Sequence, residues 1–408
     1  MSNMYDLVII GGGLMGCATA YYYQKLNPSH KVIIIERNEL CSAATSRAAA
    51  LITIVRSKKE FIPLSLETYK AIEELENLLS EKLNIRKVGV MHIARQKNTI
   101  DGLYQLTDIA KEFNQPFEFL GTNEAMNRVP WLQPTDQDVI AYMPNEAYCD
   151  PYLLGSFFAR SAALLGVRIK RNCEVEGWHV MGGKICGVKT KDEIYLGDQF
   201  VLATGTWSPV LCSPLGIHPP MAPVRSQYWI TEKNPMLFPE SSPIVILPDA
   251  QAYARPEGQS LLFGIREKNS FFVSPDQNPT DWLDFRFSPD KGMSDLEANI
   301  ERLVPFFPLA TEVGIQHYIA GFSGYTPDNY LTFGKHVNYP NLSIMAGCVG
   351  AGVSVCGGVA KSLAALASGR QSPYDIDSFR MDRFGEIDCF DKSWLTRCAE
   401  ARSVKASG

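Results

Sequence analysis

A glycine-rich turn between two short apolar runs places the strongest constraint on how this chain folds. The apolar run 7–10 leads into Gly11, Gly12 and Gly13, and Gly16 completes the pattern G-x-G-x-x-G. A helix-like segment follows to about residue 26, and a second apolar run, 32–35, ends at Glu36. A strand, a glycine turn, a helix and a second strand in this order predict a βαβ unit that binds a dinucleotide.

The glycines of this pattern have separate tasks. Gly11 permits the tight turn, Gly13 lets the backbone approach a pyrophosphate, and Gly16 lets helix and strand pack closely. The start of the helix presents free N–H groups and the positive end of its dipole to the phosphates. Glu36 follows Gly16 by 20 residues, where a carboxylate accepts hydrogen bonds from an adenosine ribose. The same carboxylate repels a 2′-phosphate, so NADP is not expected.

The composition is that of an ordinary globular protein and gives no sign of a nucleic-acid partner. The chain has 408 residues, enough for two domains, with 46% hydrophobic residues and a formal net charge of −5. Two uncharged stretches, 8–23 and 342–360, contain glycines and fit buried strand–turn–helix units better than membrane spans. The ten cysteines form no C-x-x-C pair and have no metal-ligand spacing with histidine. Since the start of the chain also lacks a basic leader, we expect a cytoplasmic protein with reduced thiols, no transmembrane segment and no metal site.

Three further segments carry small residues. Residues 37–54 are rich in Ala, Ser and Thr, and Ser42, Thr45 and Ser46 either bind a phosphate or a cofactor ring edge or cap a helix near 48–51. The strand expected at 198–204 ends in Gly205, which permits close approach to a ligand. A second glycine turn, 347–352, precedes the helix expected at 353–368.

The rest of the chain differs in texture. An amphipathic helix is expected at 61–82, and residues 88–94 alternate like a strand. Segments 219–231 and 243–264 are β-rich, with a helix expected at 295–304 and a strand at 316–322. This pattern predicts an antiparallel sheet that forms the floor of a substrate site.

Together these motifs resemble the D-amino-acid oxidase superfamily of FAD-dependent oxidoreductases, and within it the glycine oxidase, sarcosine oxidase and dimethylglycine dehydrogenase branch. The resemblance covers about residues 5–385 and rests on the order and spacing of 11–16 with Glu36, 42–50, 150–151, 173–175, 203–207, 223–227, 326–328 and 347–352. It implies an α/β (α+β) fold in which an FAD-binding Rossmann-like domain of the glutathione-reductase type adjoins a substrate domain. The cofactor domain would comprise 1–90, 150–215 and 318–385, the substrate domain 91–149 and 216–317, and a C-terminal tail 386–408.

The resemblance also implies the cofactor site. The first glycines would hold the pyrophosphate, Val175 would meet the adenine through its backbone, and the helix after Gly352 would stabilise negative charge on reduced flavin through its N-terminus. The cofactor-binding residues implied are Gly11, Gly13, Leu14, Met15, Gly16, Glu36, Arg37, Ser42, Thr45, Ser46, Ala48, Ala49, Val175, Ala203, Thr204, Gly205, Trp207, Gly350, Ala351, Gly352 and Val353.

The chain departs from its relatives where the substrate binds. Ser323 stands where glycine-oxidase-like members have an arginine, and Ser354 and Leu262 stand near lysines of the sarcosine oxidase branch. The covalent flavin cysteine of that branch has no counterpart, so non-covalent FAD is expected.

Arg56 is therefore our candidate for binding a substrate carboxylate, because a guanidinium offers two parallel hydrogen bonds. Tyr253 and Tyr325 are candidates to line the catalytic pocket. The remaining arginines of the predicted sheet are interpreted as structural or surface residues: Arg225, Arg255 and Arg266.

The reaction expected is oxidation of a C–N bond in a small amine or amino acid, by hydride transfer to the flavin and with O₂ or another electron acceptor. Orientation and exclusion of water suffice for it, without a protein base. A 2-hydroxy-acid dehydrogenase is an alternative that would need a histidine base, and we interpret His92 and His317 as core residues. A second alternative is a non-catalytic FAD-binding subunit for assembly or electron transfer. A homo-oligomer or a place in a larger complex is compatible with all three.

Overall fold

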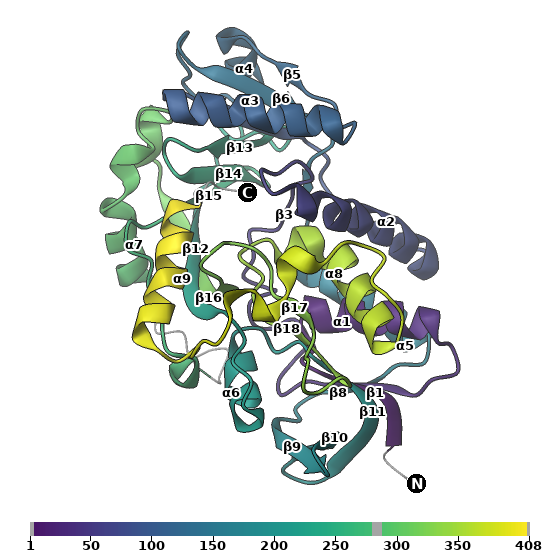
Figure 1. The fold of residues 1–408 in the computed structure, drawn as a ribbon. Coiled ribbons are helices and arrows are strands. Elements are labelled where there is room, and N and C mark those ends of the chain that lie inside the picture. The colour runs from purple at the N-terminus through teal and green to yellow at the C-terminus, as the bar shows by residue number, and fades with distance from the viewer. Residues whose placement is uncertain (1–3, 280–287, 406–408) are drawn as a thin grey trace.

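The computed structural model describes residues 4–279 and 288–405 and contains two large sheets (Figure 1). The first runs in the order β17-β18-β11-β1-β2-β8, and β9 and β10 extend it beside β11. Neighbours from β18 to β8 are parallel, which is the pattern of a βαβ fold. Its strands are β1 (Met4–Ile10), β2 (Val32–Ile35), β8 (Arg168–Lys170), β9 (Val175–Met181), β10 (Lys184–Thr190), β11 (Ile194–Leu202), β17 (Phe333–Lys335) and β18 (Leu342–Met345).

Four helices gather beside this first sheet: α1 (Leu14–Leu26), α2 (Ile62–Leu79), α5 (Pro151–Leu164) and α8 (Gly352–Ala367). Helix α1 packs against both α5 and α8, and α2 packs against α8. The α2–α8 approach depends on two glycines of α8. A Cβ on Gly357 would lie 2.7 Å from the backbone of Thr68, and one on Gly358 would lie 2.3 Å from Cα of Leu64.

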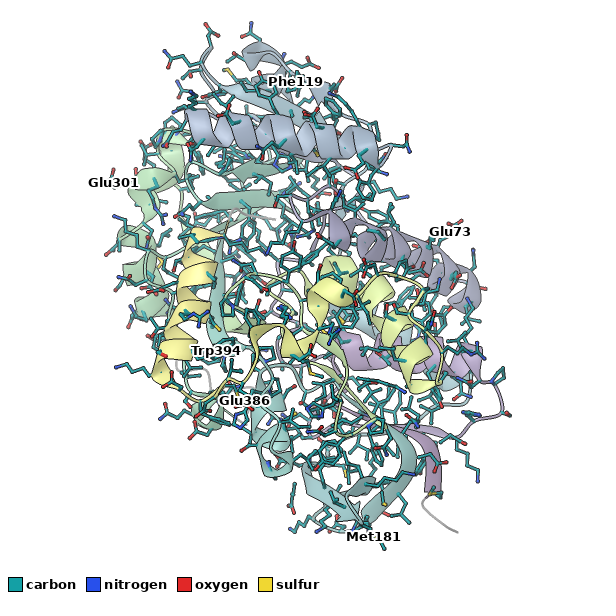
Figure 2. The ribbon with its side chains drawn as sticks, in the orientation of Figure 1. Glu73, Phe119, Met181, Glu301, Glu386 and Trp394 are labelled. Atoms are coloured by element: carbon teal, nitrogen blue, oxygen red, sulfur yellow. The ribbon has the colours of Figure 1, made fainter. Side chains whose placement is uncertain are left out.

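The second sheet runs in the order β16-β12-β15-β14-β13-β4-β6-β5 and is antiparallel except for the β13–β4 pair. In Figure 2, Phe119 marks the end of the molecule formed by this sheet, and Met181 of β9 marks the opposite end. The strands are β4 (Val90–Ala94), β5 (Glu118–Phe119), β6 (Val139–Met143), β12 (Ala222–Thr231), β13 (Ile244–Leu247), β14 (Ala252–Glu257), β15 (Ser260–Ile265) and β16 (Ile315–Tyr325). The helices beyond the first sheet are α3 (Lys97–Glu112), α4 (Thr122–Arg128), α6 (Ser208–Cys212), α7 (Pro289–Glu297) and α9 (Lys392–Val404).

The two predicted kinds of sheet are both present, and the mixed α/β fold class is confirmed. The first sheet takes its strands from the segments expected to bind the cofactor. Strand β16 belongs to the second sheet although most of it lies in the predicted segment 318–385, so the domain boundaries stay a prediction. A short sheet of β3 (Leu51–Ile52) and β7 (Ala147–Tyr148) lies outside both large sheets.

One expectation in the C-terminal half is wrong in detail. The helix expected at 295–304 is α7, which begins earlier because the Ser288 hydroxyl accepts a hydrogen bond from the Lys291 N–H and Pro289 favours a first helical position. The tail 386–408 contains α9, which packs against β12 and β16. Within 4–279 and 288–405, no helix is both long and apolar enough to cross a membrane.

Candidate functional site

A cavity of about 640 Å³ lies at the carboxyl ends of the parallel strands. Strands β1, β2, β11 and β18 all point the same way, and the residues that follow them line it: Gly11, Glu36, Ala203 and Ala346. The carboxyl edge of an open parallel sheet is where such folds bind ligands. The cavity continues from this edge to the second sheet and to the segment after α9.

The glycine turn has the geometry that its pattern predicts. Gly11 has φ = +102°, and a Cβ there would lie 2.5 Å from the carbonyl oxygen of Ala203. A Cβ on Gly16 would lie 1.9 Å from the carbonyl oxygen of Gly11, so Gly16 acts by packing and does not line the cavity. Gly13 does line it, and the Thr45 hydroxyl accepts a hydrogen bond from the Leu14 N–H at 3.1 Å.

Glu36 is held at the end of β2 by two backbone hydrogen bonds. Its carboxylate accepts one from the Gly12 N–H at 2.7 Å and one from the Asn38 N–H at 2.9 Å. Beside it, the Arg37 guanidinium carbon lies 4.1 Å from the ring centre of Trp207. Burial lowers the pKa of Arg37. This arrangement fixes the orientation of a carboxylate at the position where an adenosine ribose would lie.

Most of the predicted cofactor residues line this one cavity. Beyond those already named, they are Met15, Ser42, Ala48, Ala49, Val175, Thr204, Gly205, Gly350, Gly352 and Val353. Ser46 does not line it, because its hydroxyl donates to the carbonyl oxygens of Ser42 and Ala43 within its own turn. Ala351 is buried as the residue before α8 and also lies outside the lining.

The donor set fits FAD. Glu36 and Val175 stand at one end, the glycine turn and the start of α1 lie in the middle, and the start of α8 lies with the second sheet at the other end. Gly350 has φ = +73°, and a Cβ there would lie 2.7 Å from the Tyr325 hydroxyl. Close approach by a flat ring is thus possible only without a side chain at that position.

Arg56, Tyr253 and Tyr325 all line the cavity near the second sheet. The side chain of Arg56 is buried, and its Nε donates to the carbonyl oxygen of Thr53 at 3.3 Å. Thr53 O also accepts a hydrogen bond from Ser354 Oγ at 2.7 Å, so Arg56 lies beside the first turn of α8. Burial lowers the pKa of Arg56 to about 10, so it stays cationic at neutral pH.

The negative charge of Glu146 acts on Arg56 and raises its pKa, against the effect of burial. Glu146 is 2% exposed and accepts hydrogen bonds from the backbone N–H groups of Ile54 and Val55. Burial raises the pKa of Glu146 to about 7, against the opposite effects of these hydrogen bonds and of Arg56. The backbone just before Arg56 is therefore held by hydrogen bonds to a carboxyl group whose pKa lies near neutrality.

Several cavity residues had no signal in the sequence. Arg47 donates to the carbonyl oxygen of Ser42 at 2.6 Å and packs against Gly321. Arg402 and Lys405 reach the cavity from α9 and its end, although the tail was assigned no role. Tyr228 and Cys348 also line the cavity without having been predicted. Ser323, which the sequence marked only as a departure from its relatives, and Arg266, which was interpreted as structural or surface, line it too.

The interpretations of the remaining arginines and histidines divide. Arg225 is structural, because it pairs with Glu267 and Asp295, and Arg255 donates to the carbonyl oxygen of Ala49 at 2.7 Å. His92 lies in β4, and burial lowers its pKa to about 4. The interpretation of His317 as a core residue is wrong, since its side chain is exposed on β16. Among the described residues that line the cavity there is no histidine.

One group of metal-ligand-type side chains lies outside this cavity. His218 Nδ1 is 3.4 Å from Asp388 Oδ1 and 3.6 Å from Cys389 Sγ. The sequence predicted no metal site, because 218 and 388–389 are far apart along the chain. Burial raises the pKa of Cys389 to about 12, so its thiol is protonated in this arrangement.

Comparisons with known proteins give a consistent result. The profile of the family described as "FAD dependent oxidoreductase" matches residues 6–366. Human mitochondrial sarcosine dehydrogenase is 25% identical over 93% of this chain, and human mitochondrial dimethylglycine dehydrogenase is 24% identical over 99%. The chain spans only 41% and 46% of the length of these two relatives.

Solved structures show the same fold. L-proline dehydrogenase from P. horikoshii superposes with a TM-score of 0.82 at 20% identity, covering 94% of this chain and 98% of that one. Glycine oxidase from Geobacillus kaustophilus superposes with a TM-score of 0.78 at 21% identity, covering 93% and 99%. The fold of this chain is therefore shared with these two proteins.

Proposed function

This chain belongs to the family of FAD-dependent oxidoreductases, and we propose from this premise that it oxidises the C–N bond of a small amine or amino acid. The resemblance to the D-amino-acid oxidase superfamily that the sequence suggested is confirmed by this membership. The named relatives are a sarcosine dehydrogenase, a dimethylglycine dehydrogenase, an L-proline dehydrogenase and a glycine oxidase. An N-methyl, cyclic or D-amino acid is accordingly the substrate class proposed for this chain.

The observation that carries the proposal is Arg56. Its buried guanidinium lies beside the first turn of α8, and none of the described carboxylates lies within 4 Å of it. A substrate carboxylate would satisfy it through two parallel hydrogen bonds. This contact would orient the Cα–H bond of an amino acid towards the cofactor.

FAD, when bound, supplies the hydride acceptor at its N5 atom. The residues of this chain bind, orient and desolvate the substrate. Tyr253 and Tyr325 wall the cavity from the second sheet, and the Tyr325 hydroxyl is fixed at 3.2 Å from Ser226 Oγ. Burial raises the pKa of Tyr253, which keeps its hydroxyl protonated as a hydrogen-bond donor. The N-terminus of α8 offers its dipole to negative charge at the flavin end.

The two alternatives are weaker. A 2-hydroxy-acid dehydrogenase needs a base to take the hydroxyl proton, and the described cavity lining offers no imidazole for this task. A non-catalytic FAD-binding subunit would have no use for a buried cation that lacks an ion-pair partner beside the cofactor site.

Anaerobic bleaching of the flavin absorption band tests the proposal. A panel of N-methyl amino acids, D-amino acids and proline analogues should bleach the band, and 2-hydroxy acids should not. Arg56→Met should raise the substrate concentration needed by at least about tenfold, whereas Arg86→Met, on the exposed surface, should leave it unchanged. Bleaching by hydroxy acids alone would support the first alternative, and no bleaching by any compound would support the second.

We further propose that FAD is held without a covalent bond, that the acceptor is O₂ or another electron carrier, and that the protein works in the cytoplasm. Acid precipitation should release all yellow colour into the supernatant, and colour retained in the pellet would contradict non-covalent binding. Reoxidation of the bleached flavin in air would separate an oxidase from a dehydrogenase. The ten cysteines are all free thiols, which supports a reducing compartment.

A further inference from the structure

Two arginines face the substrate half of the cavity without a carboxylate partner. Arg56 and Arg266 each have only 8% of their surface exposed, and both line the cavity. Neither forms an ion pair with any described residue, and Arg266 Nε has no hydrogen-bond partner. They arrive from different parts of the chain, Arg56 after β3 and Arg266 after β15.

A third basic residue, Lys405 at the end of α9, lines the same cavity as Arg56 and Arg266. Its Nζ donates to the carbonyl oxygen of Val349 at 2.7 Å, next to the glycine turn before α8. Burial and the positive charges of Arg266, Arg56 and Lys58 lower the pKa of Lys405 well below its usual value.

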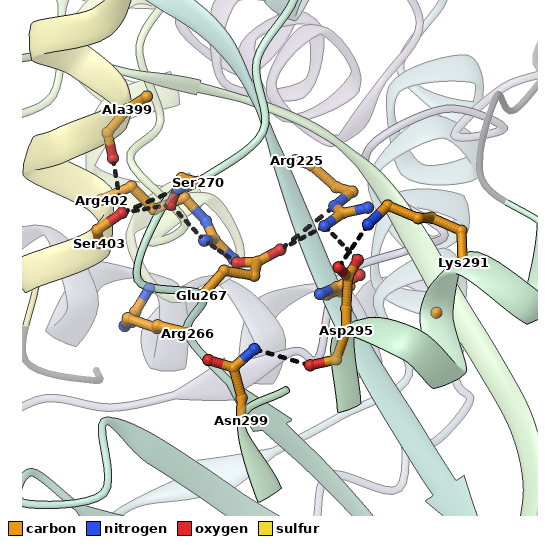
Figure 3. A network of polar contacts seen from close by, with 12 residues as sticks. Arg225, Arg266, Glu267, Ser270, Lys291, Asp295, Asn299, Ala399, Arg402 and Ser403 are labelled. Atoms are coloured by element: carbon orange, nitrogen blue, oxygen red, sulfur yellow. Dashed lines mark hydrogen bonds and ion pairs between the residues drawn. The ribbon is translucent and has the colours of Figure 1, made fainter. Parts of the chain in front are cut away.

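The carboxylates closest to Arg266 in the chain are already paired with other arginines. Figure 3 shows Glu267 between Arg225 and Arg402, with one carboxylate oxygen on each. Asp295 binds Arg225 and Lys291. Both acidic groups bind cations other than Arg266, whose guanidinium lines the cavity beside Tyr325.

The cost of this arrangement has to be met by a ligand. A buried cation without a partner loses its hydration without compensation. A single carboxylate can serve two guanidinium groups through one oxygen each, as Glu267 does, but it then gives neither of them a bidentate contact. Two carboxylates would give Arg56 and Arg266 one bidentate partner each. The N-terminus of α8 already provides for negative charge on the flavin.

We propose that the substrate is an amino acid with a second carboxylate, one acidic group binding Arg56 and the other Arg266, with Lys405 beside them as a further hydrogen-bond donor. This inference rests on the proposed function, because it assumes that the ligand of this cavity is the amino acid that is oxidised. It accounts for the departure at Ser323: the chain takes its cations from β15 and from α9 instead of from the end of β16.

Binding of unreactive diacids to the FAD-loaded protein tests the inference without turnover. Succinate, glutarate and adipate are each compared with the monoamide of the same acid, which keeps the shape and removes one charge. Perturbation of the flavin spectrum gives the dissociation constants. At least one diacid should bind about tenfold or more tightly than its monoamide. Equal binding within all three pairs would overturn the inference.

Variants then locate the second carboxylate. Arg266→Met should bring the diacid and its monoamide to equal affinity, and Arg266→Lys, which keeps the charge, should restore part of the preference. Lys392→Met removes a cation from the exposed start of α9 and should leave the preference intact. A preference that survives Arg266→Met in folded, FAD-loaded protein would overturn the assignment to Arg266.

Turnover separates this inference from the proposed function. N-methylglutamate should bleach the flavin at concentrations at least about tenfold lower than N-methylglutamine. Equal bleaching by both would leave the amine oxidation standing and refute the second carboxylate. Tight diacid binding with no bleaching by any amine would support a site for two carboxylates and refute the amine oxidation.

Discussion

Glu146 gives this site a pH dependence that can be measured as stability. Its carboxyl group is buried under the segment that carries Arg56, and burial raises its pKa from 4.5 to about 7. A carboxyl group whose pKa is raised on folding binds its proton more tightly in the folded state. Its contribution to stability is therefore greatest at low pH and is lost as the pH rises through 7.

The size of the effect follows from the shift. With a pKa near 4.5 in the unfolded chain and about 7 in the folded one, linkage gives a loss of about 2 to 3 kcal/mol between pH 5 and pH 8. His92 acts in the opposite direction over part of this range, because its pKa is lowered to about 4 and the unfolded chain takes up the proton. The comparison must therefore be made against a variant that changes only Glu146.

Glu146→Gln is that variant, because it removes the titration and keeps an oxygen acceptor for one backbone N–H. Urea unfolding of the FAD-saturated protein at pH 5 and pH 8 gives the free energy of unfolding for both proteins. The wild-type value should fall relative to that of the variant by about 2 to 3 kcal/mol from pH 5 to pH 8. A difference between the two proteins that does not change with pH would refute the burial argument for this group.

Three further predictions concern the cofactor and the cations. Gly16→Ala should abolish FAD retention during purification, since its Cβ would lie 1.9 Å from a backbone oxygen, whereas Gly102→Ala, in open space on α3, should retain the flavin. Glu36→Gln should weaken FAD binding by about tenfold in a fluorescence titration, because charged acceptors form stronger hydrogen bonds than neutral ones, and Glu73→Gln, on the exposed face of α2, should not. Glutarate binding should raise the pKa of Lys405, because an added anion opposes the burial that lowers it, and binding should therefore be coupled to proton uptake over part of the pH range. Calorimetry in two buffers of different ionisation enthalpy should detect this uptake in the wild type, and its persistence in Lys405→Met would contradict the assignment.

The cofactor half of the site was predictable because its information is local. Gly11, Gly13 and Glu36 lie within one βαβ unit, where spacing alone determines which atoms meet. Two predicted cofactor residues, Ser46 and Ala351, do not line the cavity, and each case has a local cause. Ser46 turns its hydroxyl into its own turn, and Ala351 is buried under the first turn of α8. Patterns of residue type do not distinguish a residue that lines a cavity from its neighbour that caps the same turn.

The part of the cavity beside the second sheet was predictable only in part, because its residues come from distant segments. Arg56, Tyr253 and Tyr325 were candidates from the sequence and line the cavity, whereas Lys405 was not a candidate and Arg266 was interpreted as structural or surface. Arg56, Arg266 and Lys405 meet only after two sheets and a C-terminal helix have packed together. The local sequence around an arginine at the end of a strand does not reveal whether its side chain pairs with a carboxylate in the folded protein. Arg225 and Arg266 illustrate this, since both were interpreted as structural and only Arg225 has ion-pair partners among the described residues.

The C-terminal helix links the substrate site to the stability of the second sheet. Arg402 of α9 and Arg225 of β12 share the carboxylate of Glu267, which has 5% of its surface exposed. Loss of α9 would leave Glu267 with one partner instead of two and would also remove Lys405 from the cavity. Breaking a buried ion network by removing one member is strongly destabilising. The segment that supplies Lys405 is therefore also part of the ion network of the second sheet, so its position is set by the fold of that sheet and not by the substrate.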